Sequence, residues 1–481
     1  ILLHPLRKFP GPWHYALTNL PYIRMVLSGR PHERLLKLHE KYGETVRVAP
    51  NELSFINPEA WNEVMGHRNS NNSQLENNKD PHYVDPSSGT MISAPKPDHT
   101  RMRSILNTAF SSQAMRDQAP RIAAHVDRFL ERLEELGRHQ ESVNLVKWYH
   151  FTLFDIVSDL TLGEPFGCLE SGEYHPWVAF IFARANLGAY VRTLLRLPGT
   201  EILLRLLVPR KVMREAEEHL AQTRAMVTRR FQRLISTPDF VGSMMKGKGF
   251  LVRKEILRFP EDINVLRLTD LSLCTSNHQT MTKEEIYTNT EVLIMGGSET
   301  TASGLCATTF LLASNKDVMS RCVEEITTTF AAESEIDIFS VSKLTYLEAI
   351  IKESLRLYPP APNALPRKTP PQGNIINGKF IPGNTVLGLW QWTINRASIN
   401  FRDAHEFRPE RWLGDTNFAD DRKAAFQPFS LAMAELRLIT ARLLWRFELE
   451  LAPQSRSWLD QNAFTLWDKP ALEVILGRRK M

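Results

Sequence analysis

The chain has 481 residues, 43% of them hydrophobic and 23% charged, which suits a globular protein with a large core. Its net charge of +5, from 59 basic and 54 acidic residues, is too small to indicate nucleic-acid binding. The four cysteines, Cys168, Cys274, Cys306 and Cys322, lack metal-type spacing and are too few for a disulfide framework. We therefore expect reduced, buried thiols and no metal site built from these residues.

The start of the chain bears on membrane attachment. No apolar run approaches the roughly 18 residues of a membrane span. The first residue is Ile1 rather than Met, so we expect that an N-terminal segment is missing. The first three residues are either the tail of a removed anchor or simply three apolar residues.

The first part of the chain predicts a short mixed region. Phe9 to Trp13, with two prolines, predicts a rigid non-helical hinge, and Pro31 to Tyr42 predicts a helix. Alternating apolar residues on both sides of a Pro-Asn-Glu turn predict a β-hairpin over Val46 to Phe55. The polar stretch from Asn69 to Ser88 is expected to be a loop.

The middle of the chain is almost wholly helical in pattern, from Asp98 to about Ile235. Within it, Trp177 to Leu207 is unusually apolar, and we favour core packing over the alternative, the lip of an apolar ligand site. Lys246 to Ser276 shows no sustained period and is interpreted as a loop or insertion. Because no linker or repeat divides the chain, we expect one domain over residues 1–481, mainly α with small β-sheets.

A long helix is predicted from Lys283 to about Ser314, after a capping box formed by Thr282 and Glu285. Two adjacent glycines at 296–297 cost roughly 1 kcal/mol each inside a helix, so the backbone there is expected to approach something closely.

Glu299 and Thr300 present a carboxylate and a hydroxyl beside these glycines. From the residues alone, a kinked core helix with a satisfied Thr and a Thr that bonds a bound oxygen species are equally good interpretations.

A second helix is expected to begin with a capping box of Thr345 and Glu348 and to stop before Pro359. On it, Glu353 and Arg356 face the same side at i, i+3, a pair that is worth little when exposed. Arg411 follows on a rigid turn. A carboxylate shared by both arginines would form a buried network that fixes the turn to the helix.

The last helix follows a short aromatic turn, and the two together occupy Phe426 to Trp445. The turn is Phe426 to Ser430, and Leu436, Ile439 and Leu443 then form an apolar helical stripe. The two halves meet with no loop between them. The remaining tail, Phe447 to Leu476, predicts short strands joined by turns.

Four of these segments together resemble cytochrome P-450, and they are similar to the fungal microsomal-type enzymes of secondary metabolism. They are GGSETT at 296–301, ESLR at 353–356, FRPERW at 407–412 and FQPFS at 426–430. Each motif is weak alone, but their order and separations are highly specific. The resemblance covers nearly the whole chain and implies the cytochrome P-450 fold.

The resemblance implies a role for each matching residue near the long helix and the turn. Glu299 and Thr300 match the acid–alcohol pair that relays protons to iron-bound dioxygen. Glu353, Arg356 and Arg411 match the triad that holds the fold around the haem.

Four further residues match positions that bind the cofactor. His99, which stands where many members carry Trp, and Arg103 match an early helix that binds the haem propionates. Arg367 matches another propionate contact. Phe429 matches the first Phe of the haem-binding signature.

By resemblance, the expected function is hydroxylation or epoxidation of an apolar small molecule such as a terpenoid or polyketide. The family uses haem, with NADPH supplying electrons through a flavoprotein reductase. The resemblance also implies attachment to the cytosolic face of the endoplasmic reticulum membrane through the missing N-terminal segment.

One departure from the family lies where the aromatic turn ends at Ser430 and the last helix follows, a junction that we call the seam. The haem signature continues Phe-x-x-Gly-x-Arg-x-Cys-x-Gly, but here Ser430 passes straight to Leu431. About ten residues are absent, among them the Cys whose thiolate ligates iron and favours O–O cleavage. No His or Cys follows His405, and Cys306 would lie on the distal side. We therefore expect a chain that cannot perform the family reaction.

Two alternatives explain this departure, a non-catalytic pseudoenzyme or a mis-spliced gene product. A ligand-binding scaffold that uses the old pocket is a third interpretation without positive support in the sequence.

An insertion at residues 246–276 together with a clean deletion after Ser430 is explained by a retained intron and a skipped exon segment. Sequencing of the transcript is expected to show a spliced message that lacks the insertion and contains the loop. A message that matches this chain at both places would contradict the hypothesis.

Overall fold

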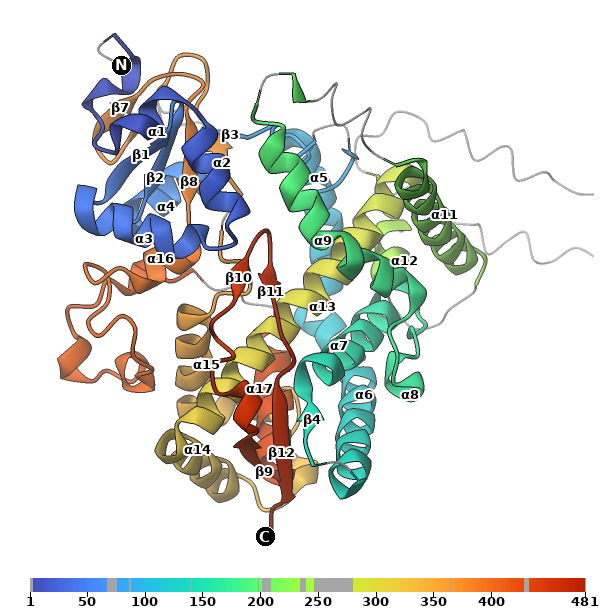
Figure 1. The fold of residues 1–481 in the computed structure, drawn as a ribbon. Helices are drawn as coiled ribbons and strands as arrows, with labels where there is room; N and C mark the ends of the chain where they lie inside the picture. The colour runs from blue at the N-terminus through green and yellow to red at the C-terminus, as the bar shows by residue number, and fades with distance from the viewer. Residues whose placement is uncertain are drawn as a thin grey trace, which may run out of the picture.

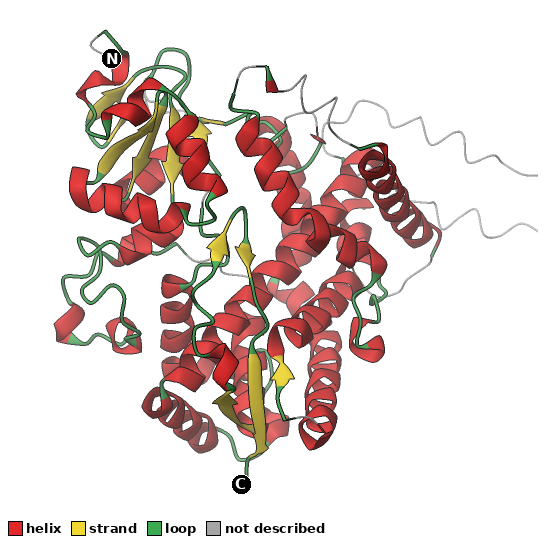
Figure 2. Cartoon of the chain, viewed as in Figure 1, coloured by secondary structure: helices red, strands yellow, loops and turns green. Residues whose placement is uncertain are grey.

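The fold is mainly helical with small β-sheets, as the sequence predicts (Figures 1 and 2). The computed structural model describes residues 3–66, 76–85, 88–139, 141–197, 199–200, 209–233, 239–245, 280–363, 365–427 and 432–480. Phe429 and the proposed insertion at 246–276 lie outside these residues.

The helices have the following bounds, in chain order. They are α1 (Trp13–Leu17), α2 (Leu20–Leu27), α3 (Pro31–Tyr42), α4 (Pro58–Met65), α5 (Lys96–Asn107), α6 (Ser112–His139), α7 (Leu145–Leu162), α8 (Cys168–Ser171), α9 (Pro176–Leu194), α11 (Arg210–Gln232), α12 (Phe240–Met245), α13 (Lys283–Ser314), α14 (Lys316–Thr329), α15 (Thr345–Leu357), α16 (Gln391–Arg396) and α17 (Ala432–Arg446).

The strands are short. They are β1 (Thr45–Ala49), β2 (Glu52–Phe55), β3 (Asn78–Lys79), β4 (Val143–Asn144), β5 (Arg367–Lys368), β6 (Asn374–Ile376), β7 (Lys379–Ile381), β8 (Val386–Leu389), β9 (Phe447–Leu451), β10 (Asn462–Ala463), β11 (Trp467–Asp468) and β12 (Glu473–Arg478).

The largest described sheet joins strands from the N-terminal part of the chain to β5 and β8, in the order β1-β2-β8-β5-β3. The predicted hairpin is confirmed as β1 and β2, which pair antiparallel with Val46 opposite Ser54. Strand β8 then pairs parallel with β2, and β3 closes the sheet against β5. The prediction of an uninterrupted loop over Asn69 to Ser88 is wrong at β3, because two residues are too few to give a strand pattern.

Helix α13 runs through the centre of the helical part and packs against α7, α15 and α17 (Figure 1). The predicted capping box of Thr282 and Glu285 is confirmed at its start. A Cβ on Gly297 would lie 3.1 Å from Val157 Cγ2, so this glycine lets α7 approach closely. Gly296 has no such neighbour among the described residues.

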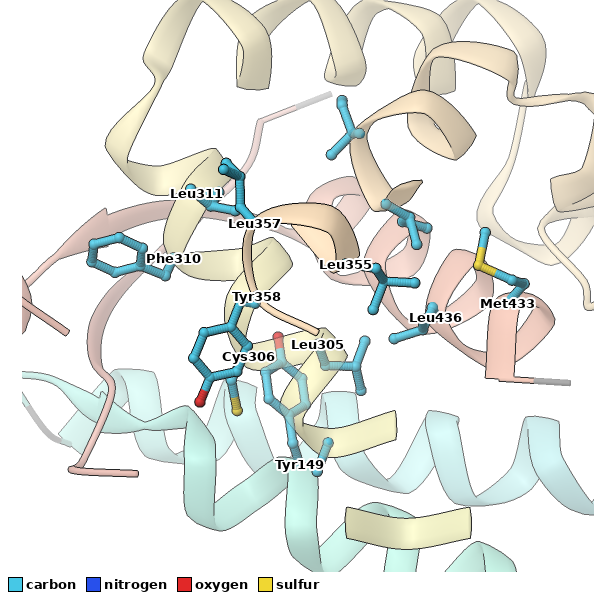
Figure 3. Close-up of a cluster of buried hydrophobic side chains, with 14 of the residues drawn as sticks. Tyr149, Leu305, Cys306, Phe310, Leu311, Leu355, Leu357, Tyr358, Met433 and Leu436 are labelled. Carbon is cyan, nitrogen blue, oxygen red and sulfur yellow. The ribbon is translucent and has the colours of Figure 1, made fainter. Parts of the chain in front are cut away.

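The centre of the core lies where α13, α15 and α17 meet. Leu305, Leu355 and Leu436 come from these three helices and gather in one apolar cluster (Figure 3). A Cβ on Gly304 would lie 3.1 Å from Leu436 Cδ2 and 3.3 Å from Leu355 Cδ2. The N-terminal part of α17 therefore packs closely against α13.

The predicted capping box of Thr345 and Glu348 is wrong. Thr345 is the first residue of α15 rather than its N-cap. The carboxylate of Glu325 on α14 takes the capping role, accepting hydrogen bonds from the backbone N–H of Tyr346 at 2.7 Å and of Leu347 at 2.9 Å. A carboxylate from another helix therefore caps the N-terminus of α15, in place of the predicted local capping box.

None of the described helices combines the length and apolar character that crossing a membrane requires.

Leu305→Ala should lower the free energy of unfolding by about 2–5 kcal/mol, because this fully buried side chain fills the junction of three helices. Leu220→Ala is the matched control, since Leu220 on α11 is 47% exposed and its change should stay within about 0.5 kcal/mol. Urea denaturation of both variants measures the difference. Equal effects would contradict the placement of the core.

Candidate active site

The buried carboxylate of Glu353 is shared by two arginines. Arg356 Nη2 lies 2.8 Å from Glu353 Oε1, and Arg411 Nε lies 3.0 Å from the same oxygen. All three side chains are fully buried. Trp412 Nε1 and the backbone N–H of Arg408 also donate to the carboxylate, at 2.9 and 3.0 Å. Burial alone would raise the pKa of Glu353, but the two arginines and the backbone N–H of Arg408 lower it.

This network ties α15 to the irregular segment that precedes α17. Arg356 donates to the backbone carbonyls of Asn395 at 2.8 Å, Ala404 at 2.7 Å and Glu406 at 3.0 Å. Arg411 pairs in addition with Asp421. The sequence-predicted residues Glu353, Arg356 and Arg411 are therefore brought together, with every charge balanced.

Glu299 and Thr300 are neighbours on α13 but take different partners. Thr300 is half-buried, and its hydroxyl donates to the carbonyl of Gly296 at 2.5 Å. The carboxylate of Glu299 is buried and forms an ion pair with Lys469, which follows β11. Glu299 Oε2 also lies 2.9 Å from His150 Nε2 on α7. In this arrangement, the acid is engaged away from the hydroxyl that it was predicted to serve.

The groups around Glu299 form a buried polar cluster. Lys469 Nζ donates to Ser303 Oγ at 3.2 Å, and His150 Nδ1 lies 2.9 Å from the hydroxyl of Tyr174. Burial would raise the pKa of Glu299, but Lys469 and His150 outweigh it and bring the pKa to about 2. Burial lowers the pKa of His150. Glu299 is therefore ionised at neutral pH.

Sequence reasoning singled out only Glu299 of this cluster. His150, Tyr174 and Lys469 come from α7, the loop before α9 and the C-terminal hairpin, and no spacing in the sequence links them. Lys469 lies between Asp468 and Pro470, so the sequence carries no local signal that it is buried.

A cavity of about 380 Å³ adjoins the cluster. Its polar side is formed by Glu299, His150, Tyr174 and Lys469, and its lining includes Phe182, Met295, Leu466 and Trp467. The apolar segment at 177–207 was predicted either to pack in the core or to form the lip of an apolar ligand site, and its described residues do both. Trp177 is fully buried in the core, as favoured, whereas Phe182 lies at the cavity. Residues 198 and 201–207 of that segment lie outside the described part.

The predicted propionate-binding residues lie on two elements. His99 and Arg103 are on α5, and Arg367 is on β5 opposite Lys79. Arg103 is exposed and Arg367 half-buried. Neither has an ion-pair partner among the described residues, and burial lowers the pKa of Arg367. Unpaired guanidinium groups suit the carboxylates of a haem.

The described thiols do not suit an iron ligand. Cys168, Cys306 and Cys322 lie on α8, α13 and α14, each buried in the main apolar core. Burial raises the pKa of all three, that of Cys168 to about 12. Protonated core thiols on three separate helices cannot replace a thiolate loop before α17. Cys274 lies outside the described residues.

The sequence comparisons agree with the fold. The family model for cytochrome P450 matches residues 9–473. Cytochrome P450 monooxygenase sthF of Phaeosphaeria nodorum is 37% identical, with alignment over the whole of this chain and 91% of the relative. Trichothecene C-15 hydroxylase of Fusarium sporotrichioides is 36% identical, over 99% of this chain and 94% of the relative.

The chain therefore belongs to the cytochrome P450 family. At the level of the family, this implies haem as the cofactor, a small-molecule substrate and a redox partner. The arginines Arg103 and Arg367 fit that cofactor, but the three thiols in the described part of the chain do not.

Glu353→Gln should lower the free energy of unfolding at pH 7 by about 3–5 kcal/mol, because two buried arginines lose their counter-charge. Glu170→Gln is a matched control: its pair with Arg128 is solvent-exposed, so the cost should be about 0–1 kcal/mol.

The same pair of variants tests the pH dependence. Because folding lowers the pKa of Glu353, its contribution is complete above the ordinary value of 4.5 and is lost as the pH falls. The gap between wild type and Glu353→Gln should narrow between pH 5 and pH 3 in urea denaturation. A constant gap would contradict the assignment.

Proposed function

We propose that this chain is a cytochrome P450 of the fungal monooxygenase lineage that, as written, has lost oxygen activation. The observation that carries the proposal is the seam before α17. Ser430 is followed in the sequence by Leu431, α17 begins at Ala432, and no Cys occurs after Cys322. The iron would therefore have no thiolate on the side where the family supplies one.

Packing of α17 supports this proposal, because the helix cannot release residues to rebuild a loop. Leu436, Ile439 and Leu443 are fully buried. At the far end, Arg442 and Arg446 both donate to Glu333, at 2.8 and 2.7 Å. Unwinding the first turns would expose this apolar stripe. This packing supports a missing loop rather than a displaced one.

The alignment to cytochrome P450 monooxygenase sthF spans 495 positions, more than the 481 residues of this chain, so that relative has residues without a counterpart here.

The chemistry of the lineage is proposed from the relatives. It is hydroxylation or epoxidation of an apolar small molecule such as a terpenoid or polyketide, with electrons from NADPH through a flavoprotein reductase. We place this chemistry at the cytosolic face of the endoplasmic reticulum membrane. Arg103, Arg367 and His99 would hold haem propionates, and Glu299 and Thr300 would hold and move protons at the carboxylate and hydroxyl oxygens. A pseudoenzyme and a mis-spliced product both fit the missing loop.

Reduction of the purified protein under CO is expected to give no thiolate-type Soret band. A ten-residue family loop with its Cys, inserted between Ser430 and Leu431, should restore that band. The same loop with Ser in place of the Cys is the matched control and should not. A thiolate-type band from the unmodified chain would contradict the proposal, and a band from the Ser loop would show that another thiol ligates iron.

A further inference from the structure

The polar side of the 380 Å³ cavity carries unmet hydrogen bonds. Glu299 Oε2 and His150 Nε2 are 2.9 Å apart, yet their contact lacks hydrogen-bond geometry and neither atom has another partner among the described residues. Both side chains are almost fully buried. A buried polar atom without a hydrogen-bond partner is destabilising, so these atoms favour a bound group that supplies one.

Lys469 adds an unused donor at the same place. Its ammonium group has three hydrogens, and its side chain is only 4% exposed. Two hydrogens are directed to Glu299 and Ser303, which leaves one without a partner in the described part of the chain. The cluster therefore offers one free donor on Lys469 and one free acceptor on Glu299, both at the wall of the cavity.

The remaining wall is mostly apolar. Phe182 from α9, Met295 from α13, and Leu466 and Trp467 from the C-terminal hairpin contribute to the lining. Thr300 does not line this cavity, because its side chain bonds back to its own helix. The volume is enough for a small polycyclic molecule.

We propose that this cavity binds an apolar cyclic alcohol, whose hydroxyl accepts a hydrogen bond from Lys469 and donates one to Glu299. The binding uses only residues of the chain and needs no iron, so it stands apart from the proposed loss of oxygen activation. It also implies that the ligand is already oxygenated, and that a hydroxylation or a carbonyl reduction must supply it.

The charges at the cluster select against other ligand classes. A carboxylate would be repelled by ionised Glu299, and an amine by Lys469. A ketone can accept from Lys469 but cannot donate to Glu299. A hydrocarbon leaves both groups unpaired. A hydroxyl is the smallest group that is both donor and acceptor.

Three rigid probes of similar shape test the predicted preference for an alcohol over a ketone and a hydrocarbon. They are 1-adamantanol, 2-adamantanone and adamantane. Titration of tryptophan fluorescence, in which Trp467 reports from the cavity, should give the tightest binding for the alcohol and the weakest for the hydrocarbon, at least about tenfold apart. Equal affinities, or no binding of any probe, would overturn the proposal.

Two variants locate the binding. Lys469→Met alone would leave the buried carboxylate of Glu299 without its counter-charge and could unfold the protein. The double variant Lys469→Met/Glu299→Leu is therefore used, because it removes both charges together. It should bring the alcohol within about threefold of adamantane, while Lys379→Met, at an exposed Lys of β7, should change nothing.

Met295→Trp narrows the cavity and should weaken all three probes. Unchanged binding in the double variant or in Met295→Trp would place the probes elsewhere and overturn the proposal.

Discussion

The interaction on which the rest of the structure depends is the buried carboxylate of Glu353 between Arg356 and Arg411. Two arginines in an apolar core are tolerated because the carboxylates of Glu353 and Asp421 and several backbone carbonyls balance them. The network fixes the irregular segment before α17 to α15. It acts upstream of the seam, so it is complete even though the loop after Phe429 is absent.

Two neighbouring polar residues of α13 differ in their partners. The hydroxyl of Thr300 donates a hydrogen bond to the Gly296 carbonyl of the same helix. Glu299 enters a charged cluster with Lys469 and His150. An ionised carboxylate held by a buried cation can accept a hydrogen bond from a ligand hydroxyl.

Local patterns predicted the elements that local physics determines. The capping box at Thr282 and the apolar run after it were sufficient to place both ends of α13. The i, i+3 spacing of Glu353 and Arg356, with an Arg on a rigid turn, was sufficient to expect their network. Tertiary contacts decided the rest. Glu325 from α14 replaced the expected cap at Thr345, and strand β3 forms only because β5 lies beside it.

In the candidate site too, local motifs could be predicted from the sequence, whereas residues brought in by tertiary contacts could not. Glu299 was visible in a motif, but Lys469 lies 170 positions later, on a hairpin whose position no spacing encodes. The missing loop, in contrast, is predicted from the sequence alone, because residues of a family motif have no counterpart after Ser430.

Resonance Raman spectroscopy of the purified chain reconstituted with haemin tests the central claim most directly, since an iron–sulfur stretching band reports a thiolate bond itself. The account predicts a haem that binds without this band. An iron–sulfur band that shifts with sulfur isotope labelling of the cysteines would contradict it.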